Sequence, residues 1–473
     1  MDTLDSDGET VSLSGSSEAF LVSRSVELSL GDMSTSGFRG STRLFFDADL
    51  SDDDATSFFW RSRGADSVFA GRGDSVSVVA EGSRRFGEIR DAVDGIFEDA
   101  DVEVDGHTAR PRLFGGFSFH DAHHEVGIWE GFPSARFVLP RYQLTSTDGG
   151  DYLTLNVYGT DVDPSRVENE ADKVRRQLED ADTDTSELQS RPRIGRIQRG
   201  TSLPEWRRQV GDALRRIESG SLEKVVLSQF LEVDLNSDFD VTRDTLRLSE
   251  KFPDCYTFVF SPDGDAGFFG APPERLVSVE GREVETEAIA GSIGRGETAE
   301  EDRRLGDRLR NSQKDLHEHA IVADTVVEQL SPLAGSVETD GMELLKLRNV
   351  QHLRTPVRAR LDDSDHDILT VAEALHPTPA VGGLPPDDAL RTIRETESFD
   401  RGWYAAPVGW VDADGDGCFA VGLRSAVARG STAKLFAGAG IVKDSDPDEE
   451  WEEVQLKYEP VLNLFRGEDT DTA

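Results

Sequence analysis

Cysteine, methionine and lysine are all scarce in this chain, which has two cysteines and three methionines among 473 residues. Cys255 and Cys418 match no metal-ligand spacing and no disulfide framework, so a reducing cytoplasm is the expected location. No apolar run approaches the length of a membrane span, and residues 1–9 lack the basic and apolar stretches of a signal peptide. The sequence therefore argues against a disulfide scaffold and favours a protein without membrane contact.

Positive charge is also deficient, since 51 lysines and arginines face 92 aspartates and glutamates and leave a formal charge of -41. A field of this sign repels nucleic acid and anionic membranes, so neither is expected as a partner. Hydrophobic residues still make up 37% of the chain, which excludes a disordered acidic tail. The acidic residues are spread along the whole sequence, in a pattern that resembles proteins of halophiles with molar salt inside the cell. The charge thus indicates adaptation to solvent rather than a chemical site.

The helix and strand patterns come in blocks. Residues 18–160 show short alternating strands between Gly, Asp and Ser turns, with one helix expected over residues 86–97. Farther along, helices and strands mix, and apolar spacing predicts one long helix over residues 300–330. Such blocks favour an α+β fold with antiparallel sheets over a doubly wound one. The expected organisation is a flexible N-terminus (1–17), a β-rich part (18–160), a charged connector (161–200) and a region that carries the candidate site (201–468).

The segment before the C-terminus has the strongest local pattern for a ligand site. An apolar strand runs into Gly438 and Gly440, where bare backbone lets a ligand approach closely. Asp446 is the expected N-cap of the helix that follows, with Pro447 at its first position.

Three charged side chains on that helix are spaced to converge. Glu450 and Glu453 are three residues apart and share one face, and Lys457 follows four residues later. With the glycine backbone they form a candidate site for a divalent cation and an anionic ligand. The alternative is an acidic, solvated helix of the kind that is common in this chain.

Three other motifs point less clearly to chemistry. Asp412-Ala-Asp-Gly-Asp-Gly417 begins like an EF-hand loop, but Leu423 stands where a glutamate is needed, so a hairpin turn is expected. His120-Asp-Ala-His-His124 is expected to be a polar loop rather than a metal site. The glycines of Gly291-Ser-Ile-Gly-Arg-Gly296 fit neither dinucleotide nor phosphate-loop spacing.

Eight stretches of the second half, together with the C-terminal segment, resemble the chorismate-utilising enzymes over about residues 204–465 and occur in the order of that family. The stretches are Lys224-Val-Val-Leu-Ser-Gln, Gly270-Ala-Pro-Pro-Glu-Arg-Leu, Glu285-Thr-Glu-Ala-Ile-Ala-Gly-Ser, Lys314-Asp-Leu-His-Glu-His, Gln351-His-Leu-Arg-Thr-Pro, Leu375-His-Pro-Thr-Pro-Ala-Val-Gly-Gly, Phe399-Asp-Arg-Gly-Trp-Tyr and Val421-Gly-Leu-Arg-Ser-Ala. Each stretch alone is a weak signal, but their common order is specific. The resemblance implies two large, mostly antiparallel sheets packed face to face with helices outside, and a chorismate-binding region over residues 201–468.

Within the family, the residues are most similar to those of isochorismate synthases. Lys224 stands where the members that form anthranilate resemble glutamine, because ammonia is itself a nucleophile whereas water needs a base. Pro379 and Ala380 resemble isochorismate synthases in the same way. The resemblance implies conversion of chorismate to isochorismate for menaquinone synthesis, without an obligatory amidotransferase partner, and we expect a monomer. The alternatives are a salicylate synthase, an aminating subunit of anthranilate or aminodeoxychorismate synthase, and a non-catalytic acidic binding protein.

The resemblance also implies roles for individual residues. Water adds at C2 of chorismate while hydroxide leaves C4, so one group must take a proton and another must donate one. Lys224 is the expected base and Glu274 the expected acid. Mg²⁺, which prefers oxygen ligands, is the expected cofactor, with Glu318 and Glu453 as ligands and Glu450 as a direct or water-mediated one.

The substrate-binding residues are expected to supply donors to two carboxylates and one hydroxyl. Arg424 and the backbone of the Gly438 segment are assigned to the pyruvyl carboxylate, and Lys457 and the Gly291 segment to the ring carboxylate. His376 is assigned to the leaving hydroxyl. The full expected set is Arg424, Gly438, Ala439, Gly440, Lys457, His376, Ala290, Gly291, Ser292 and Ala380.

Overall fold

The computed structural model describes residues 2–4, 10–12, 19–30, 38–48, 50, 56–64, 67–181, 192–348, 350–362 and 366–466. Its strands are β1 (Asp2–Leu4), β2 (Thr10–Ser12), β3 (Phe20–Leu28), β4 (Ser57–Arg61), β5 (Val68–Ala80), β6 (Asp101–Glu103), β7 (Arg112–Phe117), β8 (Ala135–Thr147), β9 (Gly150–Gly159), β10 (Ile194–Arg199), β11 (Lys224–Leu235), β12 (Thr257–Ser261), β13 (Ala266–Gly270), β14 (Arg275–Glu280), β15 (Glu283–Gly294), β16 (Ala334–Thr339), β17 (Glu343–Lys346), β18 (Val350–Leu361), β19 (Gly383–Leu384), β20 (Pro407–Asp412), β21 (Gly417–Val421), β22 (Ser425–Arg429) and β23 (Thr432–Ile441). Its helices are α1 (Phe38–Asp47), α2 (Arg85–Phe97), α3 (Pro164–Asp180), α4 (Leu203–Glu218), α5 (Val241–Lys251), α6 (Ala299–Asn311), α7 (Gln313–Leu330), α8 (Ile368–Leu375), α9 (Pro386–Thr396) and α10 (Pro447–Leu462).

The strands form two layers that are joined by long, continuous strands. One layer follows the pairings β10–β11–β23–β22–β13–β12–β4, and the other follows β7–β20–β21–β14–β15–β18. Strand β5 pairs with β4 and β8, and β8 pairs with β7, so hydrogen bonding continues from one layer into the other. Among the described strands, only β3 and β6 pair in parallel. The α+β, mostly antiparallel fold expected from the sequence is therefore confirmed.

Aromatic side chains fill the space between the layers. Phe58 of β4 stacks on Phe114 of β7 with ring centroids 3.6 Å apart. Trp403 is fully buried and packs edge-on against Phe132 at 5.4 Å and at a tilt against Phe260 of β12 at 5.2 Å. Aromatic pairs of this kind contribute about 0.5–1.5 kcal/mol each beyond the area that they bury. The aromatic core thus fixes how the two layers sit on each other.

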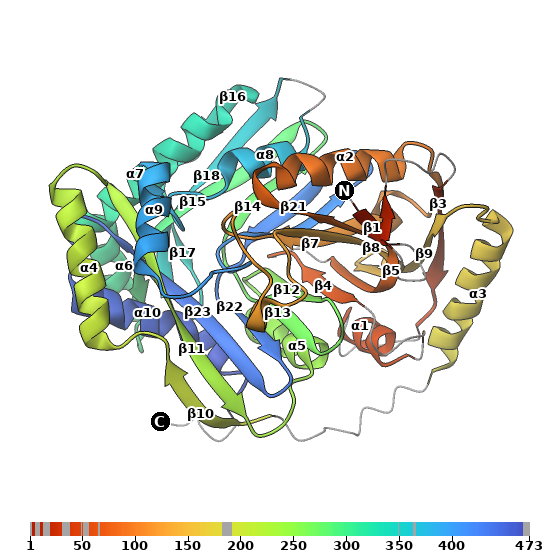
Figure 1. Cartoon of the computed structure of the whole chain (residues 1–473), viewed down its shortest axis with the longest axis horizontal. Helices are drawn as coiled ribbons and strands as arrows, with labels where there is room; N and C mark the ends of the chain where they lie inside the picture. The colour runs from red at the N-terminus through yellow and green to blue at the C-terminus, as the bar shows by residue number, and fades with distance from the viewer. Residues whose placement is uncertain are drawn as a thin grey trace.

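Helices cover the layers at one end of the molecule, where α4, α6, α7, α9 and α10 gather around β11, β15 and β23 (Figure 1). Helix α7 packs against β15 and β18, and α10 packs against β23 and α4. As the sequence predicts, Asp446 caps α10: its side chain accepts hydrogen bonds from the backbone N–H groups of Asp448 and Glu449, and Pro447 opens the helix. This capping places the acidic first turns of α10 beside the end of β23.

The long helix expected over residues 300–330 is two helices, α6 and α7. They separate at Ser312, whose backbone is extended at ψ 118° and whose side chain accepts a hydrogen bond from the Asp315 N–H. The expected connector over residues 161–200 contains α3, which packs on β3 and β9, and β10, which pairs with β11, while residues 182–191 lie outside the described ones. Of the expected flexible terminus, β1 and β2 are described, and β1 pairs with β5.

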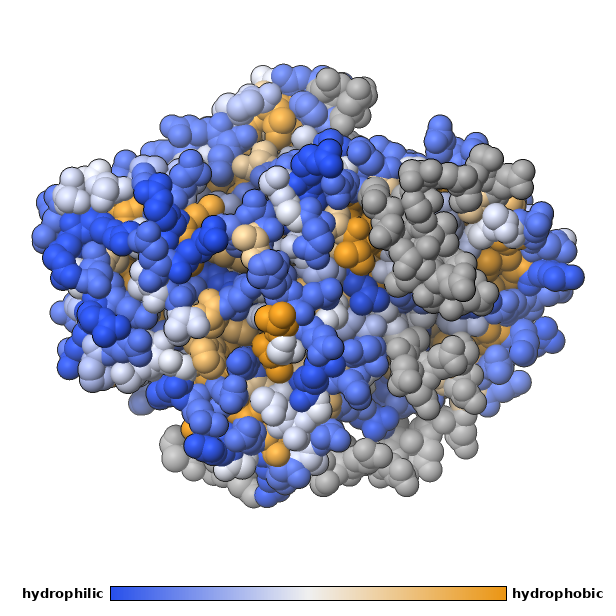
Figure 2. All heavy atoms as spheres, in the orientation of Figure 1, coloured by the Kyte–Doolittle hydropathy of each residue, from blue (hydrophilic) through white to orange (hydrophobic). Residues whose placement is uncertain are grey.

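The surface is strongly polar. The face in Figure 2 is dominated by hydrophilic residues, with hydrophobic ones scattered among them. In the part of the chain that the structure describes, no helix is both long and apolar enough to cross a membrane.

Candidate active site

A cavity lies where β11, β15 and β23 meet α7 and α10, and it gathers most of the residues singled out from the sequence. The predicted residues that line it are Lys224, Glu274, Ala290, Gly291, Ser292, Glu318, Ala380, Arg424, Gly438, Gly440, Glu453 and Lys457. They come from segments up to 233 positions apart in sequence, from Lys224 to Lys457. The fold therefore brings the separate motifs into one site.

Lys224 and Glu318 form a buried ion pair in this cavity. Lys224 opens β11 and is 1% exposed, and its Nζ lies 2.9 Å from Oε1 of Glu318 on α7. Burial alone would raise the pKa of Glu318, but the charge and hydrogen bond of Lys224 hold that pKa below its ordinary value. A Cβ at Gly440 would lie 2.4 Å from the same Oε1 and 3.0 Å from Cε of Lys224. The bare backbone of Gly440 is therefore what leaves room for the pair.

Glu274 has the properties of a proton donor. It follows β13 in the loop before β14 and is 4% exposed. Burial raises the pKa of Glu274 to about 8, and the charge of Glu287 adds to the rise. At neutral pH the carboxyl is therefore protonated, and it lines the same cavity as Lys224.

Arg424 lines the cavity with a hydrogen-bond donor that has no partner among the described residues. It precedes β22 with φ 47°, and it is 6% exposed. Its Nη2 donates to Nε2 of His352 at 2.9 Å, whereas its buried Nη1 has no partner among the described residues. A guanidinium donor without a partner on a cavity wall fits a carboxylate ligand.

His352 links Arg424 to Ser292. Because arginine only donates, Nε2 of His352 must accept, so the hydrogen of the neutral ring is on Nδ1. That Nδ1 lies 2.9 Å from Oγ of Ser292, and burial with the Arg424 charge holds the pKa of His352 well below its ordinary value. When the Ser292 hydroxyl accepts from His352, its own hydrogen is left to donate to a ligand.

Each carboxylate expected to bind metal is paired with its own lysine. Besides the Lys224–Glu318 pair, Lys457 Nζ lies 2.7 Å from Glu453 Oε1 and donates to the Gly438 carbonyl at 2.9 Å. Lys314 Nζ lies 2.6 Å from Oε1 of Glu450. Burial and the charge of Glu453 raise the pKa of Glu450 to about 7.

The carboxylates fit a hard cation by their chemistry, because Mg²⁺ prefers oxygen donors. In the structure, each of these carboxylates is positioned by its contact with a lysine. In the described part of the chain, the only three acidic, histidine or cysteine side chains with ligand atoms within 4.8 Å of one another are Asp412, Asp414 and Asp416. A cation that bound Oε1 of Glu318 and Oε1 of Glu453 would have to displace a lysine Nζ from each of these oxygens.

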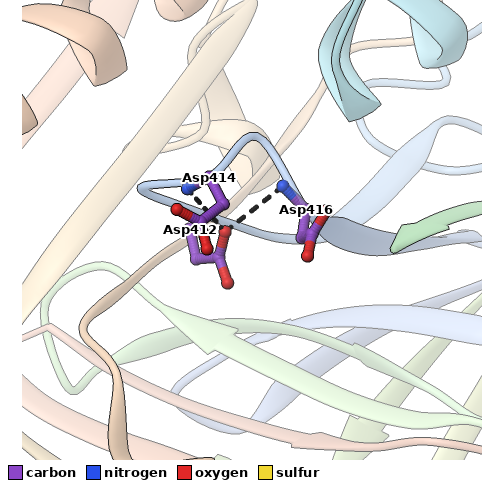
Figure 3. Close-up of side chains that lie close together, drawn as sticks. All are labelled: Asp412, Asp414 and Asp416. Atoms are coloured by element: carbon purple, nitrogen blue, oxygen red, sulfur yellow. Dashed lines mark hydrogen bonds between the residues drawn. The ribbon is translucent and has the colours of Figure 1, made fainter. Parts of the chain in front are cut away.

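The aspartate cluster is explained by the turn that contains it. As the sequence predicts, the segment forms the hairpin turn between β20 and β21 (Figure 3). Asp412 Oδ1 accepts from the backbone N–H groups of Asp414 and Asp416 at 3.0 and 3.2 Å, and Asp414 pairs with Arg110. The histidine motif is likewise a loop in which His123 is buried and paired with Asp400.

Three predicted residues do not line the cavity. Ala439 does not line the cavity although Gly438 and Gly440 do, and Glu450 is buried in contact with Nζ of Lys314. His376 turns its Nε2 toward the Phe119 carbonyl at 3.2 Å and packs against the rings of Phe86 and Phe119, so its side chain does not line the cavity.

Sequence reasoning missed several residues that line the cavity. The added ones are Val226, Pro273, Ile289, His352, Val381, Arg401, Tyr404, Ala405, Leu423, Phe436 and Ala437. Arg401 is 3% exposed, pairs with Glu397, and donates to the carbonyls of Val381 and Val226 at 2.9 and 2.8 Å. It therefore ties the strand of Lys224 to the segment of Ala380. His352, Arg401 and Tyr404 lie in stretches that resemble the family and follow its order, and this location was the sequence signal that could have identified them.

Comparison with known proteins identifies the family of the chain. A family model described as chorismate binding enzyme matches residues 40–466. The chain is 34% identical over 426 residues to isochorismate synthase MenF of Bacillus subtilis (strain 168), covering 87% of this chain and 88% of that protein. It is 37% identical over 407 residues to the salicylate biosynthesis isochorismate synthase of Pseudomonas aeruginosa, covering 82% and 81%.

Two solved structures share the fold. The menaquinone-specific isochorismate synthase MenF from Escherichia coli aligns with a TM-score of 0.77 at 24% identity, covering 96% of this chain and 97% of that one. Component I of anthranilate synthase from Streptococcus pneumoniae TIGR4 aligns with a TM-score of 0.71 at 20% identity, covering 86% and 93%. Because both hydrating and aminating enzymes have this architecture, the choice between them depends on the residues of the site.

Proposed function

The chain belongs to the chorismate-binding enzyme family, and we propose that it is an isochorismate synthase. One observation carries the proposal: a buried lysine, Lys224, and a buried carboxyl, Glu274, whose pKa is raised by burial to about 8, line the same cavity. Addition of water needs a base that amination does not need, and loss of hydroxide needs an acid. Isochorismate synthases at 34% and 37% identity over most of the chain support the same reaction.

The chain's own residues supply the proton transfers. Lys224 takes a proton from water as its oxygen bonds to C2 of chorismate, and Glu274 donates a proton to the oxygen that leaves C4. The C2–O bond forms, the C4–O bond breaks, and the two ring double bonds shift by one position, so substrate and product are isomers. Arg424 Nη1 and the Ser292 hydroxyl offer donors to the substrate carboxylates.

A divalent cation is part of the proposal. Glu318 and Glu453 would hold Mg²⁺, with Glu450 close behind, and the ion would supply positive charge for the ring carboxylate. Lys457, which bonds the Gly438 carbonyl, keeps the wall beside Glu453 in place. We also propose a cytoplasmic location and a role in menaquinone synthesis. The first rests on the two cysteines, which are buried and unpaired, and the second on the name MenF that the Bacillus relative shares with the menaquinone-specific enzyme of Escherichia coli.

Product analysis tests this function. Purified protein is incubated with chorismate and Mg²⁺, with and without ammonium, and the products are separated by chromatography. We expect isochorismate in reversible balance with chorismate, without pyruvate. Salicylate with stoichiometric pyruvate would assign a lyase instead, and anthranilate or aminodeoxychorismate that needs ammonium would assign an aminating enzyme. Recovery of chorismate alone would favour a binding protein.

A further inference from the structure

Glu287 on β15 is a buried carboxylate that the proposed reaction does not use. Its side chain is 0% exposed, and all of its bonds go to arginines or to the loop of the acid. Oε1 accepts from the backbone N–H of Arg275 at 3.0 Å. Oε2 accepts from Nη2 of Arg63 at 2.8 Å and from Nε of Arg354. Burying a charge is costly unless it is fully paired, so this arrangement is one that the fold must maintain.

Two of these contacts hold the residues on either side of the acid. Arg275 directly follows Glu274, and its N–H is bonded to Glu287. Arg63 donates from its other nitrogen, Nη1, to the carbonyl of Pro273, which directly precedes Glu274, at 2.6 Å. Arg63 follows β4 in the N-terminal half of the chain, so a distant segment reaches into the acid's loop.

We propose that Glu287, through Arg63 and the Arg275 amide, is the positioning residue for the general acid Glu274. Glu287 holds the Pro273–Glu274–Arg275 segment on both sides of the acid, through Arg63 at Pro273 and directly at the Arg275 amide. It also keeps a negative charge next to the acid. This proposal rests on the proposed function, because it takes Glu274 as the group that donates to the leaving oxygen.

The charges around Glu274 support the second part of the proposal. Three cations face it, Lys224 from β11, Lys457 from α10 and Arg63 from the segment after β4, and each lowers its pKa. Glu287 acts in the opposite direction, second only to burial. Without Glu287, the cations would favour the carboxylate, and the acid would lose its proton at lower pH.

The test uses Glu287→Gln, which keeps the shape and removes the charge, and Arg63→Lys, which keeps the charge and removes the fork that spans Glu287 and Pro273. Glu343→Gln is the matched control, because Glu343 is exposed and its Oε1 lies 2.8 Å from Nη1 of Arg354. For each variant, kcat and kcat/KM for chorismate consumption are measured from pH 6 to pH 10, with all products counted. Circular dichroism and melting report whether each variant is folded.

In Glu287→Gln, the alkaline limb of kcat/KM should move down by about one pH unit, as expected when a close charge is removed. In Arg63→Lys, kcat should fall about 10-fold to 100-fold through misplacement of the acid, with KM nearly unchanged and a smaller movement of the limb. Glu343→Gln should match the parent in kcat, in KM and in the position of the alkaline limb.

A folded Glu287→Gln variant with the parental limb and kcat would overturn the proposal, and so would an equal movement in Glu343→Gln. If Glu287→Gln does not fold, Arg63→Lys decides, because unchanged kcat and limb there mean that the network is only structural. The proposed function is tested separately, by identifying the product that the unmodified chain forms. If that product is salicylate, the proposed function fails, but comparing the alkaline limb of kcat/KM between parent and variants still tests whether Glu287 positions Glu274.

Discussion

Lys224 Nζ lies 2.9 Å from Glu318 Oε1, so the expected base and an expected metal ligand share one buried ion pair. The pair fits in its present position because Gly440 has no side chain there. Any ligand that takes over Oε1 of Glu318 must displace the Nζ of Lys224 from that oxygen. The proposed base and the proposed cation site share this contact.

Replacing Lys224 with alanine should lower kcat by about 100-fold to 10,000-fold, because water is a poor nucleophile without a base. Chorismate binding, measured by calorimetry, should persist, since Arg424 and Ser292 remain. Lys443→Ala is the control, because Lys443 is exposed just beyond β23 and should tolerate the change. Activity of Lys224→Ala near that of the parent would remove this residue from the mechanism.

Glu318→Gln and Glu453→Gln should each raise the Mg²⁺ concentration needed for half-maximal activity, because each removes an anionic oxygen ligand. Chelation with EDTA should abolish activity of the parent. Calorimetric titration of Mg²⁺ without substrate gives a second readout that does not depend on turnover. Glu452→Gln is the control, since Glu452 is exposed beside Glu453. Variants that titrate like this control would mean that the ligands lie elsewhere.

The raised pKa of Glu274 predicts the alkaline limit of the enzyme. Only the protonated carboxyl can donate, so kcat/KM should fall as pH rises through about 8, the pKa that burial and Glu287 produce. The sign is opposite to that of an ordinary glutamate, which would have lost its proton near pH 4. Glu274→Gln should lose about 100-fold to 10,000-fold in kcat. A parent profile that stays flat to pH 10 would exclude Glu274 as the acid.

Much of the lining of the candidate cavity was predictable, because its residues stand in motifs that resemble the family and follow its order. Lys224, Glu274 and Glu318 lie in three such motifs, and the fold brings them to one cavity. The cap at Asp446 was also predictable, because capping depends only on residues within one turn. The α+β class followed from the blocks of strand and helix periodicity.

The remaining features depend on contacts that are distant in sequence. The direction of His376 is set by Phe86 and Phe119, more than 250 positions earlier. The apolar spacing runs across Ser312 and therefore predicts one continuous helix, whereas in the structure Ser312 caps α7 with its side chain. Arg63 and Glu287 are 224 positions apart, and neither belongs to a pattern that local reasoning detects as a pair.

The melting temperature of the folded protein should rise with KCl. At a formal charge of -41, repulsion between carboxylates opposes the compact state when counterions are dilute. The Debye length shrinks from about 10 Å at 0.1 M salt to about 3 Å at 1 M, which screens this repulsion. This dependence is part of the halophilic character that we propose from the composition.

Salt also weakens attractive ion pairs on the surface, such as Arg207 with Asp448, and that effect acts in the opposite direction. Each exposed pair contributes only about 0–1 kcal/mol, and even if every basic residue paired with one carboxylate, an excess of 41 carboxylates (92 minus 51) would remain. Repulsion should therefore dominate the balance. Thermal melts from 0.1 to 3 M KCl test this, with a parallel series in sucrose of equal osmolality to separate screening from solvent exclusion. A melting temperature that is flat or falls with KCl, or that rises equally in sucrose, would contradict the electrostatic explanation.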